Sequence, residues 1–132
     1  MKRIFFLFSL SLLSISGFAQ QPAYTLDRTV DNVDCYYSLT QCNGKTVVLL
    51  KFNNRNASPV NISWKDQFTT SQIPQKTPGF KAYQIALPPG VSEPADCTDV
   101  SHKDFIINVD EVNMTYLADI TGFEFSDVSV TQ

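Results

Sequence analysis

Apolar and polar residues alternate with a period of two along much of the chain, and this pattern restricts the fold more than any other feature. Successive side chains of a β-strand point to opposite faces of a sheet, so this period is typical of strands buried on one face. No segment keeps a helical period over more than two turns. The sequence therefore predicts an all-β protein.

The alternation predicts strands in six segments and leaves residues 110–118 open between a strand and a short helical turn. The six segments are residues 33–39, 46–52, 60–68, 82–87, 105–109 and 123–130. In the last, Phe123 and Phe125 are out of phase with Val128 and Val130, which a bulge at Ser126-Asp127 would reconcile. The residues before 33 are a polar lead-in to the first expected strand, residues 69–79 are expected to be irregular, and Pro88-Pro89-Gly90 is expected to end a strand.

About seven short strands separated by turns favour an antiparallel β-sandwich of two sheets, with a small closed barrel as the alternative. Residues 46–52 are apolar at both phases, which predicts a central strand. The order Cys42, Trp64, Cys97 is similar to that of immunoglobulin domains, where a tryptophan packs on a disulfide between the sheets. Cys42 is expected to precede its strand and not to lie within it, which departs from the immunoglobulin pattern. The prediction is therefore only an immunoglobulin-like sandwich, with Trp64 in its core.

The chain begins with Lys2 and Arg3, followed by an apolar run over residues 4–15 and by Gly17-Phe18-Ala19. This order is typical of a secretory signal peptide, which predicts cleavage after residue 19 and a single mature domain over residues 20–132. The apolar run is shorter than the roughly 20 residues of a membrane-spanning helix. We therefore expect a secreted or periplasmic protein without a membrane anchor.

The chain has 10 basic and 13 acidic residues and a formal net charge of -3. Cleavage of the leader would remove Lys2 and Arg3 but no acidic residue, so the mature protein is more acidic still. Nucleic-acid binding depends on the neutralisation of phosphates by lysine and arginine. The composition therefore argues against a nucleic-acid partner.

Three cysteines, Cys35, Cys42 and Cys97, lie in the mature chain, and export makes a disulfide the expected state of two of them. If residues 35–42 form a strand, Cys35 and Cys42 are about 23 Å apart, far beyond the roughly 4 to 7 Å between the Cα atoms of a disulfide. Cys42 is beside the turn-like Asn43-Gly44, and Cys97 is in a polar loop. The favoured pair is Cys42 with Cys97, which leaves Cys35 as a free thiol.

Several stretches carry a likeness to known proteins. They are Cys42-Asn43-Gly44, residues 47–54 and 59–64, Leu87-Pro88-Pro89-Gly90 before Cys97, and residues 120–125. Over residues 42–130 the chain resembles small uncharacterised exported proteins of Bacteroidota, although it lacks the further cysteines that the resemblance implies around residues 71–79. Those proteins carry no assigned activity, so the resemblance implies export and fold and assigns no functional residue.

No motif with a recognisable catalytic or cofactor-binding pattern is found. His102 is the only histidine, which excludes a site built from several histidines of one chain. It could pair with Cys97 as base and nucleophile, but a disulfide at Cys97 is the simpler assignment. Asp96, Asp99 and Asp104 lack the spacing of an EF-hand loop and are expected to keep a loop soluble. We therefore expect no enzyme, metal or cofactor.

Aromatic residues are the remaining candidates for a binding site. Tyr36, Phe80, Tyr83 and Tyr116 could form a platform for a sugar on one sheet face, although their phases also suit a core. The sequence thus predicts an exported, non-enzymatic binding or structural module that acts on a protein or an extracellular polymer. A carbohydrate-binding module is the alternative, and a redox or tethering role for Cys35 is a third hypothesis.

Overall fold

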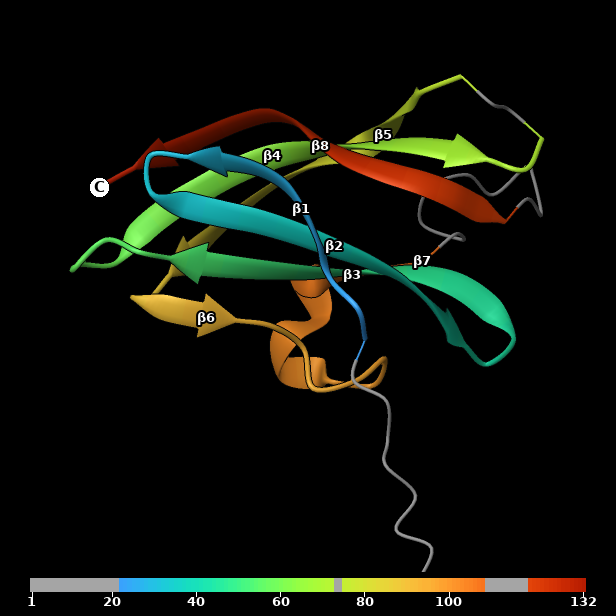
Figure 1. Cartoon of the computed structure of the whole chain (residues 1–132), viewed down its shortest axis with the longest axis horizontal. Helices are drawn as coiled ribbons and strands as arrows, with labels where there is room; N and C mark the ends of the chain where they lie inside the picture. The colour runs from blue at the N-terminus through green and yellow to red at the C-terminus, as the bar shows by residue number, and fades with distance from the viewer. Residues whose placement is uncertain (1–21, 73–74, 109–118) are drawn as a thin grey trace, which may run out of the picture.

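The computed structural model describes residues 22–72, 75–108 and 119–132, which form two antiparallel sheets packed face to face (Figure 1). In the first, which we call sheet A, three consecutive strands lie side by side: β1 (Thr25–Val30), β2 (Val33–Cys42) and β3 (Lys45–Asn54). The far edge of β3 pairs with two short strands, β6 (Gly90–Ser92) and β7 (Ile106–Asn108).

The second sheet, sheet B, contains three long strands in the order β5 (Thr77–Leu87), β4 (Val60–Thr70) and β8 (Ile120–Thr131). A 3-10 helix, η1 (Val100–Phe105), leads into β7. The prediction of an all-β sandwich is confirmed, with two sheets in place of the closed barrel. The finer immunoglobulin-like assignment stays a prediction. Among the described residues, no helix has the length and apolar character needed to span a bilayer.

The hairpins of sheet A depend on residues that accept a left-handed backbone. Asn43 and Gly44 have φ angles of 54° and 77° and join Cys42 to its partner Lys45. Such two-residue turns match the twist of the strands they connect, and Asn-Gly is a preferred sequence for them. The turn between β1 and β2 has the same form.

The main core lies between the sheets and is rich in aromatic rings. Phe52 of β3 is in its centre, with ring centroids 5.1 Å from Trp64, 5.3 Å from Phe105 and 5.6 Å from Phe125. Trp64 is 1% exposed and stacks on Tyr83 at 5.0 Å, so its predicted core position is confirmed. These contacts bury large apolar surfaces, which is the main favourable contribution to folding.

The expectation that β3 is central is also confirmed, because both of its faces are covered. Val48, Leu50 and Phe52 face the main core. Val47 and Leu49 point to the other face of sheet A, where they form a second cluster with Ile106. Three partly buried side chains pack against this second cluster: Tyr24, Cys42 and Cys97.

Strands occur in three regions where none was predicted. The polar residues before Val33 form β1, an exposed edge strand whose partner is β2. Residues 69–70 and 77–79 extend β4 and β5, and Gly90 begins β6 where a strand was expected to end. Each is held by backbone pairing to a neighbour, which alternation in a single segment does not reveal.

The bulge expected at Ser126-Asp127 is confirmed. Ser63 pairs with Ser129 but Lys65 pairs with Ser126, so β8 contains one more residue than β4 between these pairs. Asp127 has a φ angle of 48°, as one residue of a bulge often does. Residues 110–118, left open between strand and helix, lie outside the described residues, as does Val109.

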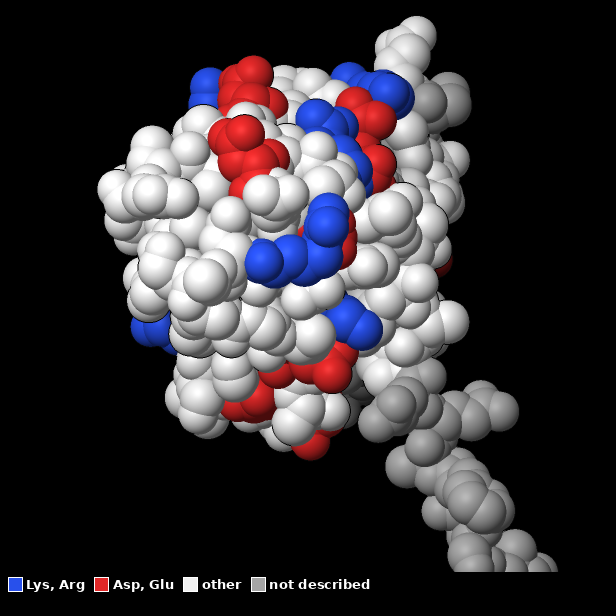
Figure 2. Space-filling model, turned by 60° about the vertical axis from the view of Figure 1, so that its left-hand side comes forward, with Lys and Arg blue, Asp and Glu red and all other residues white. Residues whose placement is uncertain are grey.

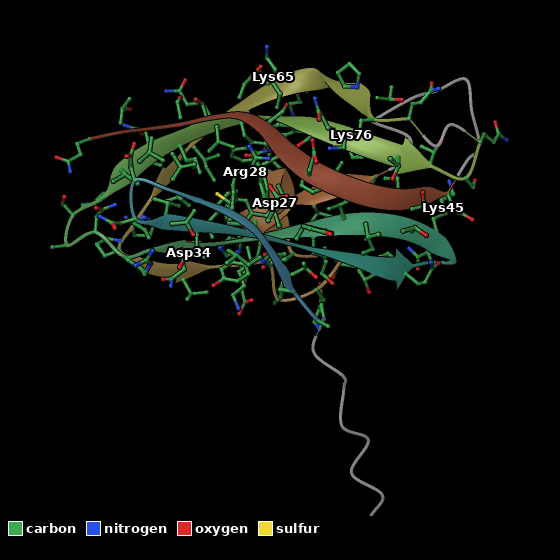
Figure 3. The ribbon with its side chains drawn as sticks, turned by 45° about the horizontal axis from the view of Figure 1, so that its top comes forward. Asp27, Arg28, Asp34, Lys45, Lys65 and Lys76 are labelled. Atoms are coloured by element: carbon green, nitrogen blue, oxygen red, sulfur yellow. A yellow bond between two sulfur atoms is a disulfide. The ribbon has the colours of Figure 1, made fainter. Side chains whose placement is uncertain are left out.

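Asp27 connects the two sheets at the edge formed by β1. It is the extra residue of a bulge between Leu26 and Arg28. Its Oδ2 atom accepts hydrogen bonds from Arg28 Nε at 2.8 Å and from the backbone N–H of Phe125 at 3.3 Å. Figure 3 shows Asp27 and Arg28 between the ribbons of β1 and β8.

Candidate functional site

The predicted disulfide between Cys42 and Cys97 is present, with a Cα–Cα distance of 6.1 Å. Cys42 is the last residue of β2, and therefore lies within a strand where a loop position was expected. Cys35 is on the same continuous strand, which is why the two cannot pair. The bond holds the segment after β6 against the outer face of sheet A.

Cys35 is a free thiol in the main core with no exposed surface. Burial, and secondarily the charge of Asp27, raises the pKa of this thiol to about 12. The thiolate is the reactive form of cysteine, so Cys35 is protected from chemistry in the folded protein.

A cleft of about 350 Å³ lies on the outer face of sheet A. Its floor comes from cross-strand partners, Tyr36 of β2 and Lys51 of β3. We call it the tyrosine cleft, and its lining residues are Pro22, Tyr24, Tyr36, Lys51, Glu93, Pro94 and Ala95. In Figure 1 the residues just before β1 and the segment that leads from β6 to η1 are close to each other, and they form the walls of the cleft.

Lys51 is the central charged group of the cleft. Its Nζ atom is 5.2 Å from the ring centroid of Tyr24 and 5.3 Å from that of Tyr36, within the range of cation–π attraction. The nearest carboxylate oxygen is Glu93 Oε2 at 3.8 Å, which is an ion pair but too long for a hydrogen bond. The rings therefore help to position an ammonium group whose N–H donors lack a close acceptor among the described residues.

The hydroxyl group of Tyr24 is the one buried side-chain polar atom of the described residues that has no hydrogen-bond partner. Burial, followed by the negative charge of Glu93, raises the pKa of this phenol to about 12. It stays protonated at neutral pH and remains a donor. A buried polar atom without a partner costs about 1 to 3 kcal/mol, which a bound acceptor would recover.

Asp99 holds the wall of the cleft that follows β6. Its Oδ2 atom accepts hydrogen bonds from the N–H of Ala95 and from His102 Nδ1, both at 2.9 Å, and its Oδ1 accepts one from the N–H of Ser101. The Ala95 bond, first, and then those from His102 and Ser101 hold the pKa of Asp99 below its ordinary value, against a small opposing effect of desolvation. Asp99 therefore acts as a cap of the loop.

The other polar residues of this segment are occupied in the same way. Asp96 accepts hydrogen bonds from the backbone N–H and the hydroxyl of Thr98, both at 2.7 Å. No group of three or more His, Cys, Asp and Glu side chains in the described part of the chain could hold a metal ion. Cys97 is bonded to Cys42, so Cys97 and His102 do not form the pair of nucleophile and base that the sequence left open.

His102 belongs to a second hollow, of about 280 Å³, on the side of the molecule where η1 meets β5. Its lining includes Ile85, Ala86, Ser92 and Phe105. The imidazole packs 5.4 Å from the ring of Phe105 and donates a hydrogen bond from Nδ1 to Asp99. These contacts give His102 a structural role in the loop.

The predicted aromatic platform is not assembled as one surface. Tyr36 is on sheet A, whereas Tyr83 is on β5 of sheet B and is 7% exposed beneath Trp64. Phe80 also belongs to β5, and Tyr116 lies outside the described residues. Sequence reasoning found Tyr36 but missed Tyr24, Lys51 and Glu93. Lys51 carried a signal, since it is the single charge within the apolar run of residues 47–52.

Charges elsewhere on the described surface are mostly paired. Arg55 Nε is 3.0 Å from Asp34 Oδ2, and Lys65 Nζ is 3.2 Å from Asp127 Oδ2. Figure 2 shows basic and acidic side chains interspersed on the face turned toward the viewer. The tyrosine cleft is therefore distinguished by its aromatic rings and donors without acceptors, and not by a concentration of one charge.

The fold and the cleft define a β-sandwich with a small, amphipathic cleft on the outer face of sheet A. Comparison of the chain with protein families, curated proteins and solved structures found no match.

Proposed function

We propose that this chain is an exported, non-enzymatic binding module that binds its ligand in the tyrosine cleft. The observation that carries the proposal is the pair of donors without acceptors, Tyr24 Oη and Lys51 Nζ, placed beside two aromatic rings. A cleft of about 350 Å³ is at the lower end of the roughly 300 to 1,000 Å³ of small-ligand sites.

Export is supported by two independent features. The leader over residues 1–19 has the order of a secretory signal peptide. The disulfide between Cys42 and Cys97 is typical of oxidising compartments. We place the protein in the periplasm or the medium, where its ligand is a group of an extracellular polymer or of a partner protein.

The absence of an enzymatic activity is also part of the proposal. Nucleophilic catalysis needs an activated group next to a base. The thiol of Cys35 is buried with a raised pKa, and Cys97 is oxidised. The carboxylate of Glu93 and the ammonium of Lys51 face each other, which suits hydrogen bonding to a ligand better than proton transfer.

Ligand-induced stabilisation tests this proposal across several chemical classes of ligand. The protein is expressed with its own leader, purified from envelope and medium fractions, and heated in the presence of neutral saccharides, amino acids, dicarboxylates and nucleosides. A ligand that binds the folded state raises Tm by an amount that grows with its concentration relative to Kd. The same panel is applied to Ala95→Trp, in which an indole fills the cleft.

A rise in Tm that Ala95→Trp abolishes supports the proposal. Lys51→Met, which removes the ammonium group of the cleft, should also lower the rise in Tm, and Lys65→Met is its matched control, since Lys65 forms an ion pair of its own on sheet B. If no compound of any class raises Tm in a manner that depends on the cleft, the proposed function is wrong.

A further inference from the structure

We infer that the ligand group of the tyrosine cleft is a neutral sugar ring with adjacent hydroxyl groups. This inference rests on the proposed function and names the chemical class that the cleft accepts. It follows from the position of three polar groups, Tyr24 Oη, Lys51 Nζ and a carboxylate oxygen of Glu93, around one hollow.

The distance between Lys51 and Glu93 favours a group that bridges them. At 3.8 Å their nitrogen and oxygen atoms do not form a direct hydrogen bond. A hydroxyl group is both donor and acceptor, so a single one can accept from the ammonium and donate to the carboxylate. A second hydroxyl on the neighbouring carbon can then accept from the unpaired Tyr24 hydroxyl.

The charges of the cleft disfavour ionic ligands. Lys51 and Glu93 are opposite in sign, so the cleft has no net charge from this pair. An anion would be repelled by Glu93, and a cation would have to displace the Lys51 ammonium from the faces of Tyr24 and Tyr36. A zwitterionic amino acid would have to separate the pair and lose the hydration of two charges. A neutral polyhydroxylated ring keeps the pair in place.

The apolar lining also fits a sugar ring. Besides the two tyrosines, Pro22 and Pro94 contribute rigid apolar surface. The C–H groups on the face of a sugar ring can pack on such surfaces while its hydroxyl groups reach the polar atoms. The exposed lining as a whole is more polar than apolar, which suits a ligand rich in hydroxyl groups.

The cleft is rigid enough to select a ring by its hydroxyl positions. Tyr36 and Lys51 are in the middle of paired strands, and the opposite wall is held by Asp99 and by the disulfide at Cys97. Groups that are already ordered lose little entropy when a ligand binds.

Calorimetric titration with methyl glycosides of neutral hexoses and N-acetylhexosamines tests the inference. We expect Tyr24→Phe, which removes one donor, to weaken binding about fivefold, and Lys51→Met, which removes a charged donor, to weaken it about 10- to 100-fold. Lys65→Met is expected to leave Kd unchanged.

Monodeoxy analogues of the tightest glycoside locate the contacts. The analogue that lacks the hydroxyl bound by Tyr24 loses affinity for the wild type but loses nothing more in Tyr24→Phe, so the two changes are not additive. Strict additivity for every deoxy analogue, or glycoside binding that survives Lys51→Met and Ala95→Trp, overturns the inference.

Other outcomes separate this inference from the proposed function. One outcome is that glycosides do not bind, while an amino acid or nucleoside raises the Tm of the wild type and not that of Ala95→Trp. In that case the sugar assignment is wrong, but the proposal of a binding module stands. If no class of compound depends on the cleft, both are wrong.

Discussion

The side chain of Asn54 connects the two sheets, because its Nδ2 atom donates a hydrogen bond to the carbonyl oxygen of Leu87 at 3.2 Å. Asn54 ends β3 in sheet A, whereas Leu87 ends β5 in sheet B. The same amide donates to the carbonyl of Ser58, and its Oδ1 accepts from the backbone N–H and the side chain of Asn56. A residue that is 2% exposed therefore has all its donors and acceptors satisfied.

Replacement of Asn54 by leucine is expected to lower the free energy of unfolding by about 2 to 4 kcal/mol, because buried carbonyl and amide groups lose their partners. Urea unfolding followed by tryptophan fluorescence measures the loss. The control is Asn61→Leu, at an exposed position of β4. A loss for Asn54→Leu no larger than that of the control would show that water replaces these bonds without penalty.

Removal of the disulfide by Cys42→Ser together with Cys97→Ser is expected to lower stability by about 4 kcal/mol on the chain-entropy model, for a sequence separation of 55 residues. It should also accelerate amide exchange at Ala95, whose N–H is bonded to Asp99. Unfolding curves and hydrogen exchange measure the two effects. Unchanged exchange at Ala95 would mean that Asp99 alone holds the wall of the cleft.

Asp34 is expected to make stability depend on pH in the acid range. Burial by itself raises the pKa of this carboxyl, but hydrogen bonds from Thr29, Arg55 and Asn53 and the charge of Arg55 outweigh it and lower the pKa below 3.8. The folded state thus binds the proton less well than the unfolded state. The contribution of Asp34 is complete above about pH 4 and is lost as the pH falls through its folded pKa.

Unfolding free energies measured between about pH 2 and pH 6 test this sign. The wild type should lose more stability on acidification than Asp34→Asn, which cannot titrate. An Asp127→Asn control, at the exposed carboxylate paired with Lys65, should keep the slope of the wild type. Identical slopes for Asp34→Asn and the wild type would contradict the assignment.

The thiol of Cys35 is expected to resist alkylation in the folded protein. It is fully buried and the pKa is raised to about 12, so the thiolate is scarce and inaccessible at neutral pH. Mass spectrometry after iodoacetamide treatment should show no modification in buffer and one modified cysteine in denaturant. Fast labelling of the native protein would contradict this expectation and support the hypothesis of a redox or tethering role for Cys35.

Much of the scaffold could be predicted from the sequence because it depends on local patterns. Alternation located six strands, Asn43-Gly44 located a hairpin turn, and the phase change near Ser126 located a bulge. Strand geometry excluded a bond between Cys35 and Cys42, and the positions of Cys42 beside a turn and of Cys97 in a polar loop favoured the bond that the structure contains. The strands, the bulge and the excluded bond need only the rise per residue and the direction of successive side chains.

The edge strand β1 and the short β6 were missed because their residues are polar or few. Their conformation is decided by backbone pairing with β2 and β3, and not by burial of their own side chains. Such pairing depends on the neighbouring strand, so the sequence of the paired segment itself gives little indication of it.

The tyrosine cleft was decided only by the tertiary structure. Pairing register sets Tyr36 opposite Lys51, the residues before β1 bring Tyr24, and the segment after β6 brings Glu93. These residues are far apart in the sequence and share no periodic pattern. Local propensities determine which residues form strands, but the site depends on distances between strands, which arise only when the whole chain buries its two clusters of apolar side chains.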